Sequence, residues 1–458
     1  MKSSSFDLDG ILASEGQIST KKMMRYVFSL SLPGMLAQVS SILMQYIDSS
    51  MVGDLGAGSS ASIGLVLPGT WVLGSLLRSC GIGFTVQTAH CIGAGEKFKA
   101  KRILFNGLFI CVFFSLILAL IASSISFFLP SWLGSPKDLQ NEASWYFLIF
   151  SASSPFFALI DFFTGMNQCS GNMKVPGILN GAMCFLDILF NWFFIYRCNL
   201  GVKGAALGSV CAVFLTSAVM AVYTFFFSDV FKFEKNIRLD IKKNWKPDFP
   251  CIKSAMVTSF PVAVESTAFS GALVAVTKII APLGAVSLAA NSFATTAESL
   301  CYMPVYGIQE AAAALTGQSY GAKRNNLVKG FSAITVMYGA LFMAFTGIVM
   351  YFLCPVVFRF ITPDIQIQQL AVEILRIELF AEPFFGCSIV AAGALRGRGD
   401  TLVPGIMNLF SLWVVRIGLS LLLVEKYALK GIWIAMAVEL TFRGLILVLR
   451  LAVSSEKN

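Results

Sequence analysis

The sequence predicts an all-α integral membrane protein with twelve transmembrane helices, arranged as two six-helix lobes related by a pseudo-two-fold axis along the membrane normal. Composition, the number of apolar segments and an internal repeat predict this fold. Of the 458 residues, 56% are hydrophobic and only 13% are charged, and the mean hydropathy is +0.75. A soluble domain carries about 25% charged residues. The chain is therefore expected to be a polytopic membrane protein.

Twelve apolar segments have the length of a membrane span, which needs about 20 residues. They lie at residues 27–51, 61–88, 103–128, 143–165, 175–197, 203–227, 252–280, 288–315, 331–356, 367–393, 403–424 and 431–453. Lys and Arg are concentrated in every second loop, most strongly between Asp229 and Asp248. Because basic residues accumulate in cytoplasmic loops, we expect both termini in the cytoplasm of a multi-pass protein of the cell (plasma) membrane.

The chain repeats itself at an offset of 228 residues. Most of the matching residues are Gly and Pro, which fix backbone shape rather than side-chain chemistry. Examples are Pro33 with Pro261, Gly56 with Gly284, Gly93 with Gly321, Pro155 with Pro383, and Val175-Pro176-Gly177-Ile178 with Val403-Pro404-Gly405-Ile406. Six spans per copy is an even number, so both copies insert the same way up. The predicted organisation is an N-terminal lobe at 1–228, a cytoplasmic linker at 229–250 and a C-terminal lobe at 251–458.

The first span carries a row of polar residues on one helical face. Gln38, Ser41, Gln45 and Asp48 are spaced by three, four and three residues. An ionisable side chain at bilayer depth costs about 2.5–3.5 kcal/mol on insertion scales, so it calls for a reason. We predict that Asp48 binds a proton or cation. Gln38 and Gln45 are predicted to face the substrate cavity, with interhelical hydrogen bonding as the alternative.

The fifth span carries a carboxylate between amides. Asp187 and Asn191 are four residues apart, and Asn180 lies two turns earlier on the same face. Carboxylate and amide oxygens suit a hard cation, and a carboxyl group in such surroundings can also hold a proton. The three residues are therefore predicted to join Asp48 in the cation or proton site. A purely structural polar network is the alternative.

Acids and polar side chains in the second copy are predicted to line the substrate cavity. Several lie near prolines, which free backbone carbonyls that often line transport paths. Glu265 follows Pro261 by one turn, and Glu382 directly precedes Pro383. The predicted cavity residues are Glu265, Asn291, Glu298, Tyr302 and Glu382, with Gln38 and Gln45 from the first span.

Charged residues inside the spans are mostly acidic. Glu439 and Arg443 are four residues apart and are predicted to form a mutually neutralising structural pair, and Arg416 is a candidate third member. The acids are Asp48, Asp161, Asp187, Glu265, Glu298, Glu310, Glu382 and Glu439, against the bases Arg78, Lys278, Arg416 and Arg443. An acidic interior of low dielectric attracts cations. This favours cationic substrates and coupling to H⁺ or Na⁺.

Several short motifs resemble those of the multidrug and toxic compound extrusion (MATE) transporters. They are Asp48-Ser49-Ser50-Met51-Val52-Gly53-Asp54-Leu55-Gly56, Gly171-Asn172-Met173-Lys174-Val175-Pro176, Gly317-Gln318-Ser319-Tyr320-Gly321-Ala322 and Leu395-Arg396-Gly397-Arg398-Gly399-Asp400-Thr401. The resemblance covers about residues 25 to 453. It implies two six-helix bundles around a central cavity, and export of organic, often cationic compounds against inward H⁺ or Na⁺.

The resemblance also implies roles for individual residues. The first-helix carboxylate of the family carries over to Asp48. One branch of the family has Asn followed by Asp four residues later in the fifth helix, whereas this chain has Asp187 followed by Asn191. Another branch places an acid two turns after the seventh-helix proline, where this chain has Phe269, and Glu265 lies one turn earlier.

Other functions fit the sequence less well. A lipid-linked oligosaccharide flippase of the same wider superfamily should have a basic cavity, which the acid excess opposes. A membrane enzyme or a receptor is a further alternative. However, the single histidine, His90, cannot build an imidazole-rich metal site or readily serve a serine hydrolase. We therefore expect no catalytic residues, no cofactor and no metal site. The expected partners are a small organic molecule and the lipid bilayer, with no nucleic acid and no obligate protein partner.

Each acid of the predicted ion and cavity sites is present in only one copy of the repeat. The positions matching Asp48, Asp187, Glu265, Glu298 and Glu382 are Val276, Val415, Ala37, Thr70 and Ser154. The scaffold is therefore predicted to be symmetric, whereas the residues that bind ion and substrate are predicted to differ between the two copies.

Overall fold

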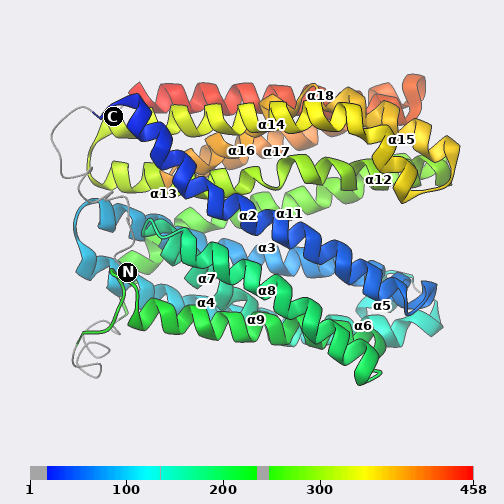
Figure 1. Ribbon diagram of the computed structural model, residues 1–458, viewed down its shortest axis with the longest axis horizontal. Coiled ribbons are helices and arrows are strands. Elements are labelled where there is room, and N and C mark those ends of the chain that lie inside the picture. Colours follow the sequence, from blue (N-terminus) through cyan, green and yellow to red (C-terminus); the bar gives the residue numbers. More distant parts are fainter. Residues whose placement is uncertain (1–17, 135, 235–246, 457–458) are drawn as a thin grey trace. The chain divides into compact units, whose positions relative to one another are not determined.

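The structure is a computed structural model that describes residues 18–134, 136–234 and 247–456, and within these ranges it is helical without strands (Figure 1). The helices of the first copy are α2 (Thr20–Gly53), α3 (Ala57–Gly93), α4 (Lys97–Ile125), α5 (Leu129–Trp132), α6 (Lys137–Ala152), α7 (Ser154–Cys169), α8 (Lys174–Trp192), the π-helical η1 (Phe193–Arg197) and α9 (Gly201–Phe226). Those of the second copy are α11 (Phe249–Ile280), the 3₁₀ turn η2 (Ala281–Leu283), α12 (Ala285–Tyr302), α13 (Val305–Gly321), α14 (Asn325–Ile361), α15 (Ile365–Glu378), α16 (Glu382–Gly397), α17 (Leu402–Phe410), the π-helical η3 (Ser411–Arg416) and α18 (Ile417–Glu456).

The twelve predicted spans correspond to these helices. Among the described residues, eight helical stretches are long and apolar enough to cross a bilayer, and α6 with α7 pass the same test as a pair bent by 46°. One of the eight, Leu402–Ser454, holds two predicted spans, because α18 bends at Ala428, where φ is 48° and ψ is −131°. The broken pairs α12–α13 and α15–α16 supply the remaining two spans. The predicted all-α fold of twelve spans is confirmed.

Backbone geometry repeats with the sequence. Glycines with positive φ begin or precede equivalent helices at Gly56 (108°) and Gly284 (93°), and again at Gly171 (87°) and Gly399 (86°). Residues with a Cβ rarely adopt this conformation, so the repeat conserves glycine there. The helix breaks before Pro155 and Pro383 are likewise 228 residues apart. The duplication is thus a repeat of turns and breaks.

Contacts divide the described chain into two units. The N-terminal unit is Val39–Ser266, and the C-terminal unit combines the residues up to Gln38 with those from Thr267 onward. The first part of α2 therefore belongs to the C-terminal unit, and the first part of α11 belongs to the N-terminal unit. The lobe boundaries taken from the repeat, 1–228 and 251–458, stay a prediction, and the contact units differ from them by this exchange.

Equivalent helices pack together in the two units. In the N-terminal unit α7 contacts α3, α4 and α9, and in the C-terminal unit α16 makes the equivalent contacts with α13, α14 and α18. Two glycines on α16, Gly393 and Gly397, bring its backbone against that of α13, where a Cβ would overlap Gln309 and Ala313. Small residues four apart allow such close packing of membrane helices.

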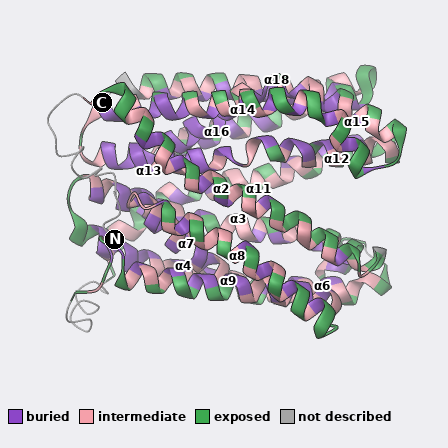
Figure 2. Cartoon of the chain, viewed as in Figure 1, coloured by how far each residue is buried: buried purple, intermediate pink, exposed green. Residues whose placement is uncertain are grey.

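Apolar side chains cover both the cores and the outer faces of the units. Phe84, Phe162 and Met166 are fully buried in the N-terminal unit, as are Phe358 and Trp433 in the C-terminal unit. Exposed residues recur along α9 and α14 (Figure 2), and they include large hydrophobic side chains such as Phe214, Val222, Phe345 and Phe352. Exposed apolar faces on long helices are expected where lipid is the solvent.

Candidate functional site in the N-terminal unit

The last turns of α2 and of α8 bring two carboxylates to one amide. The Nδ2 atom of Asn191 donates to Oδ1 of Asp48 at 2.9 Å and to Oδ2 of Asp187 at 3.0 Å. Asp187 and Asn191 are each only 1% exposed, and they lie one turn apart on the same face of α8. The predicted meeting of Asp48, Asp187 and Asn191 is therefore present in the structure.

Further contacts complete the surroundings of Asp187. The side chains of Asp48 and Asp187 interact with each other, and Ser209 of α9 interacts with Asp187. Tyr146 of α6 is close enough to interact electrostatically with both acids. Sequence reasoning missed Ser209 and Tyr146, because both are uncharged and nothing in the sequence distinguishes them from the other polar residues of α9 and α6.

This arrangement is suited to binding one positive charge. Two adjacent carboxylates, one half-buried and one buried, would repel each other without a proton or a cation. The side-chain oxygen of Asn191 is buried and has no hydrogen-bond partner. Together with carboxylate oxygens of Asp48 and Asp187 it offers the oxygen ligands that a hard cation prefers. The site can thus hold a proton or a small cation.

Close packing of α9 fixes the amide. A Cβ atom at Gly208 would overlap the side-chain oxygen and the backbone nitrogen of Asn191. Gly208→Ala is therefore expected to lower the free energy of unfolding by about 1–3 kcal/mol, the usual cost of overpacking. Thermal unfolding of the purified protein would show it. Gly181→Ala on α8 is the matched control, because a Cβ there lies 3.9 Å from its nearest neighbour, Ser40 Oγ. Equal stability of the two variants would contradict the close packing.

The other predicted residues of the first copy lie outside this cluster. Asn180 is half-buried, two turns earlier on α8. Gln45 is exposed, and its backbone carbonyl accepts a hydrogen bond from Ser49. Gln38 is half-buried and belongs to the C-terminal unit. The polar face predicted for the first span is therefore divided between the two units, and the cavity role of the glutamines stays a prediction.

A second group of acids is buried in the C-terminal unit. Glu298, Glu378 and Glu382 are at most 3% exposed and interact electrostatically with one another. Both carboxylate oxygens of Glu378 and of Glu382 are buried without a hydrogen-bond partner. The cavity role of Glu298 and Glu382 stays a prediction, since both side chains are enclosed by the unit in this structure.

The remaining predicted cavity residues have separate neighbours. Asn291 accepts a hydrogen bond from the indole nitrogen of Trp433 at 3.0 Å. Tyr302 packs against Phe385 with ring centroids 5.4 Å apart. Glu265 is half-buried on α11 and belongs to the N-terminal unit. The structure therefore does not gather the predicted cavity residues within one unit.

The predicted ion pair in the last span is confirmed. Nε of Arg443 lies 3.1 Å from Oε1 of Glu439, and the side chains are 10% and 0% exposed. Ser411 donates a hydrogen bond to the same carboxylate oxygen at 2.7 Å. Arg416, the candidate third member, contacts the sulfur of Met436 and interacts electrostatically with Glu298 and Glu378.

Comparison with known proteins agrees with this architecture. The MatE family model matches residues 33–193 and 261–422. The probable multidrug resistance protein NorM of Thermotoga maritima is 26% identical over 427 residues, covering 91% of this chain and 90% of that protein. The multidrug resistance protein NorM of Aliivibrio fischeri is 24% identical over 450 residues, covering 94% of each chain.

Solved structures share the fold. The Vibrio cholerae MATE transporter VcmN in its bent form superposes with a TM-score of 0.85 at 20% identity, covering 96% of this chain and 99% of that one. A MOP superfamily transporter from Pyrococcus furiosus gives a TM-score of 0.88 at 18% identity, with the same coverage.

Twelve helical spans in a duplicated arrangement, with acids buried among the helices, define a multi-pass membrane transporter. The family model covers both copies of the repeat. The chain belongs to the MatE family, and the resemblance seen in the sequence motifs is confirmed.

Proposed function

We propose that the protein is an antiporter that exports organic, predominantly cationic, drugs or metabolites in exchange for H⁺ or Na⁺. The observation that carries this proposal is the bridge from Asn191 to Asp48 and Asp187. Similar proteins bear the name multidrug resistance protein, which supports drugs as a substrate class. The proposed location is the plasma membrane, with both termini in the cytoplasm and no obligate protein partner.

Coupling follows from charge at the bridged site. With one proton or one Na⁺ bound, the two carboxylates of Asp48 and Asp187 are partly neutralised and can stay close together. Without it, their repulsion favours a conformation in which they separate or reach water. A cation that binds one conformation better than another shifts the population between them, and alternating access uses such a shift.

A gradient-swap assay tests activity and coupling ion together. The protein in proteoliposomes should accumulate or release a fluorescent organic cation when an H⁺ or Na⁺ gradient is imposed, and the effective gradient identifies the ion. Asp48→Asn should abolish the gradient-driven component, because one of the two charges at the site is removed. Transport at the native rate by this variant would show that the assigned site is wrong.

Asp54→Asn is the matched control for this test. Asp54 follows α2 and is exposed, and it accepts a hydrogen bond from the hydroxyl of Tyr196 at 2.8 Å. The substitution makes the same chemical change six residues away from Asp48, outside the buried site. Its gradient-driven transport should equal that of the native protein.

A further inference from the structure

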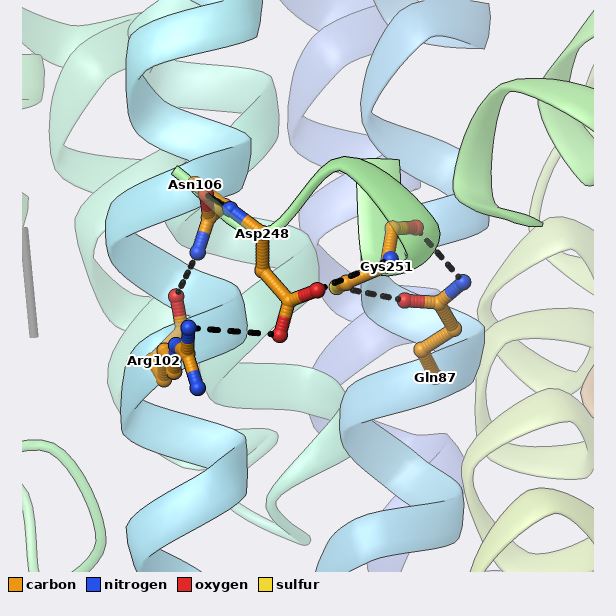
Figure 3. A network of polar contacts seen from close by, with 5 residues as sticks. All are labelled: Gln87, Arg102, Asn106, Asp248 and Cys251. Atoms are coloured by element: carbon orange, nitrogen blue, oxygen red, sulfur yellow. Dashed lines mark hydrogen bonds and ion pairs between the residues drawn. The ribbon is translucent and has the colours of Figure 1, made fainter. Parts of the chain in front are cut away.

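The start of α11 is fastened to α4 by a network of polar contacts centred on Asp248 (Figure 3). The backbone N–H of Asp248 donates to Oδ1 of Asn106 at 3.0 Å. Its carboxylate lies 3.5 Å from Nη2 of Arg102 and also accepts from the backbone N–H of Cys251 at 3.4 Å. Asp248 thus caps the first turn of α11 and holds that turn on α4.

A second pair of contacts fastens the same turn to α3. Nε2 of Gln87 donates to the backbone carbonyl of Cys251 at 3.2 Å, and the thiol of Cys251 donates to Oε1 of Gln87 at 3.2 Å. Figure 3 shows Gln87 reaching α11 from one side while Arg102 and Asn106 reach it from the other. We call Gln87, Arg102, Asn106, Asp248 and Cys251 the linker clip.

Close packing continues beneath the clip. Ser259, which is 2% exposed, accepts a hydrogen bond from the backbone N–H of Gly83 at 2.9 Å and donates one to the carbonyl of Cys80 at 3.1 Å. A Cβ at Gly83 would overlap the backbone of Ala255, which is fully buried. The two backbones are in direct contact, so α11 cannot slide along α3 here without breaking buried hydrogen bonds.

The residues that lead away from α9 are held by the same end of α4. The ammonium group of Lys101, which is 5% exposed, donates to the backbone carbonyl of Lys232 at 2.8 Å. Phe231 is fully buried, and Phe233 stacks on Phe225 with ring centroids 5.0 Å apart. The first turns of α4 therefore hold the chain where it enters the linker and again where it leaves it.

We propose that the linker clip is a permanent anchor, which keeps α11 from Phe249 to Ser259 fixed on α3 and α4 throughout the transport cycle. Every contact of the anchor lies within the N-terminal unit, to which α11 belongs as far as Ser266. Buried backbone contact at Gly83 and Ala255 favours an anchor over a switch, because a switch would have to expose these groups in each cycle. Rearrangement of α11 during transport is then confined to residues after Ser259.

Opening the clip tests whether it is needed. In the variant Gln87→Ala with Asp248→Ala, hydrogen exchange of the backbone amides from Cys251 to Ala255 should become about tenfold faster, because charge-assisted and amide contacts to the first turn are lost. Efflux, on the assumption of the proposed function, should fall about tenfold as well. The control is Glu96→Ala, which removes an exposed pair with Lys99 at the start of the same helix α4.

Closing the clip covalently tests whether it stays shut. Gln87→Cys can be linked to the native Cys251 by a short bifunctional thiol reagent, in a background whose other ten cysteines are replaced and which is shown to transport. The linked protein should transport at least as fast as the unlinked one. Loss of transport on linking would overturn the anchor, as would native efflux from the open variant despite faster exchange. A native protein without any gradient-driven efflux would instead contradict the proposed function, since the exchange measurement does not depend on transport.

Discussion

Glu439→Ala is expected to destabilise the protein by about 3–5 kcal/mol, because it leaves the buried guanidinium of Arg443 without its carboxylate. Arg443 is 10% exposed on its side chain and lies over the ring of Phe385, 5.2 Å from its centroid. Glu298 also interacts electrostatically with Arg443, but among the described residues the ion pair of Arg443 is with Glu439, so the folded state of the variant bears most of the desolvation cost. The thermal unfolding midpoint of the purified protein should fall by several degrees.

A double variant separates the loss of the pair from the creation of an unpaired charge. Glu439→Met with Arg443→Met removes both charges and keeps similar volumes, so it should be markedly more stable than the single variant. Glu425→Ala on the exposed part of α18 should change stability by no more than about 0.5 kcal/mol. A single variant as stable as the native protein would show that Arg443 finds another partner.

Asp187→Asn is expected to abolish gradient-driven efflux while the protein stays folded. The new amide keeps the size of the side chain and can still hydrogen-bond to Asn191 and Ser209, but the site then has only the charge of Asp48. The measurement is the same proteoliposome assay, with chromatography of the purified variant as the check on folding. Efflux within twofold of the native rate would contradict the assignment.

An exchange variant tests whether the order of acid and amide on α8 matters. Asp187→Asn with Asn191→Asp restores a carboxyl group beside Asp48, because the native Asn191 side chain already lies 2.9 Å from it. We expect this variant to regain a measurable part of the efflux that Asp187→Asn loses. If it transports no better than the single variant, the carboxyl group is needed at the position that Ser209 contacts.

The sequence predicted those features that depend on local pattern. The lengths of the apolar segments predicted the spans. The positions of Gly and Pro predicted the turns and breaks, as the paired positive-φ residues Gly56 and Gly284 show. The spacing of Glu439 and Arg443 predicted an ion pair within one helix, which is present. These features are determined by residues close in sequence, where helix geometry leaves few alternatives.

Contacts between helices were harder to predict from the sequence. Spacing placed Asp187 and Asn191 on one face of a helix, but only packing brings that face to Asp48, and only packing adds Ser209 and Tyr146. The transfer of the first turns of α11 to the N-terminal unit also had no signal in the pattern. It depends on backbone contact at Gly83, which hydropathy does not detect.

The two π-helical segments have a consequence for how the copies can be compared. A π turn holds one additional residue, so it rotates all later side chains by about 100° relative to a regular α-helix. In the second copy this turn is Ser411–Arg416, which matches residues 183–188, whereas in the first copy it comes later, at Phe193–Arg197. Over residues 189–192 and their counterparts the copies are out of rotational phase. This interval contains Asn191, and Val415, the counterpart of Asp187, lies within the π-helical turn itself. An aspartate placed at Val415 would therefore point in a different direction from Asp187, and the ion site cannot be copied to the other half by substitution alone.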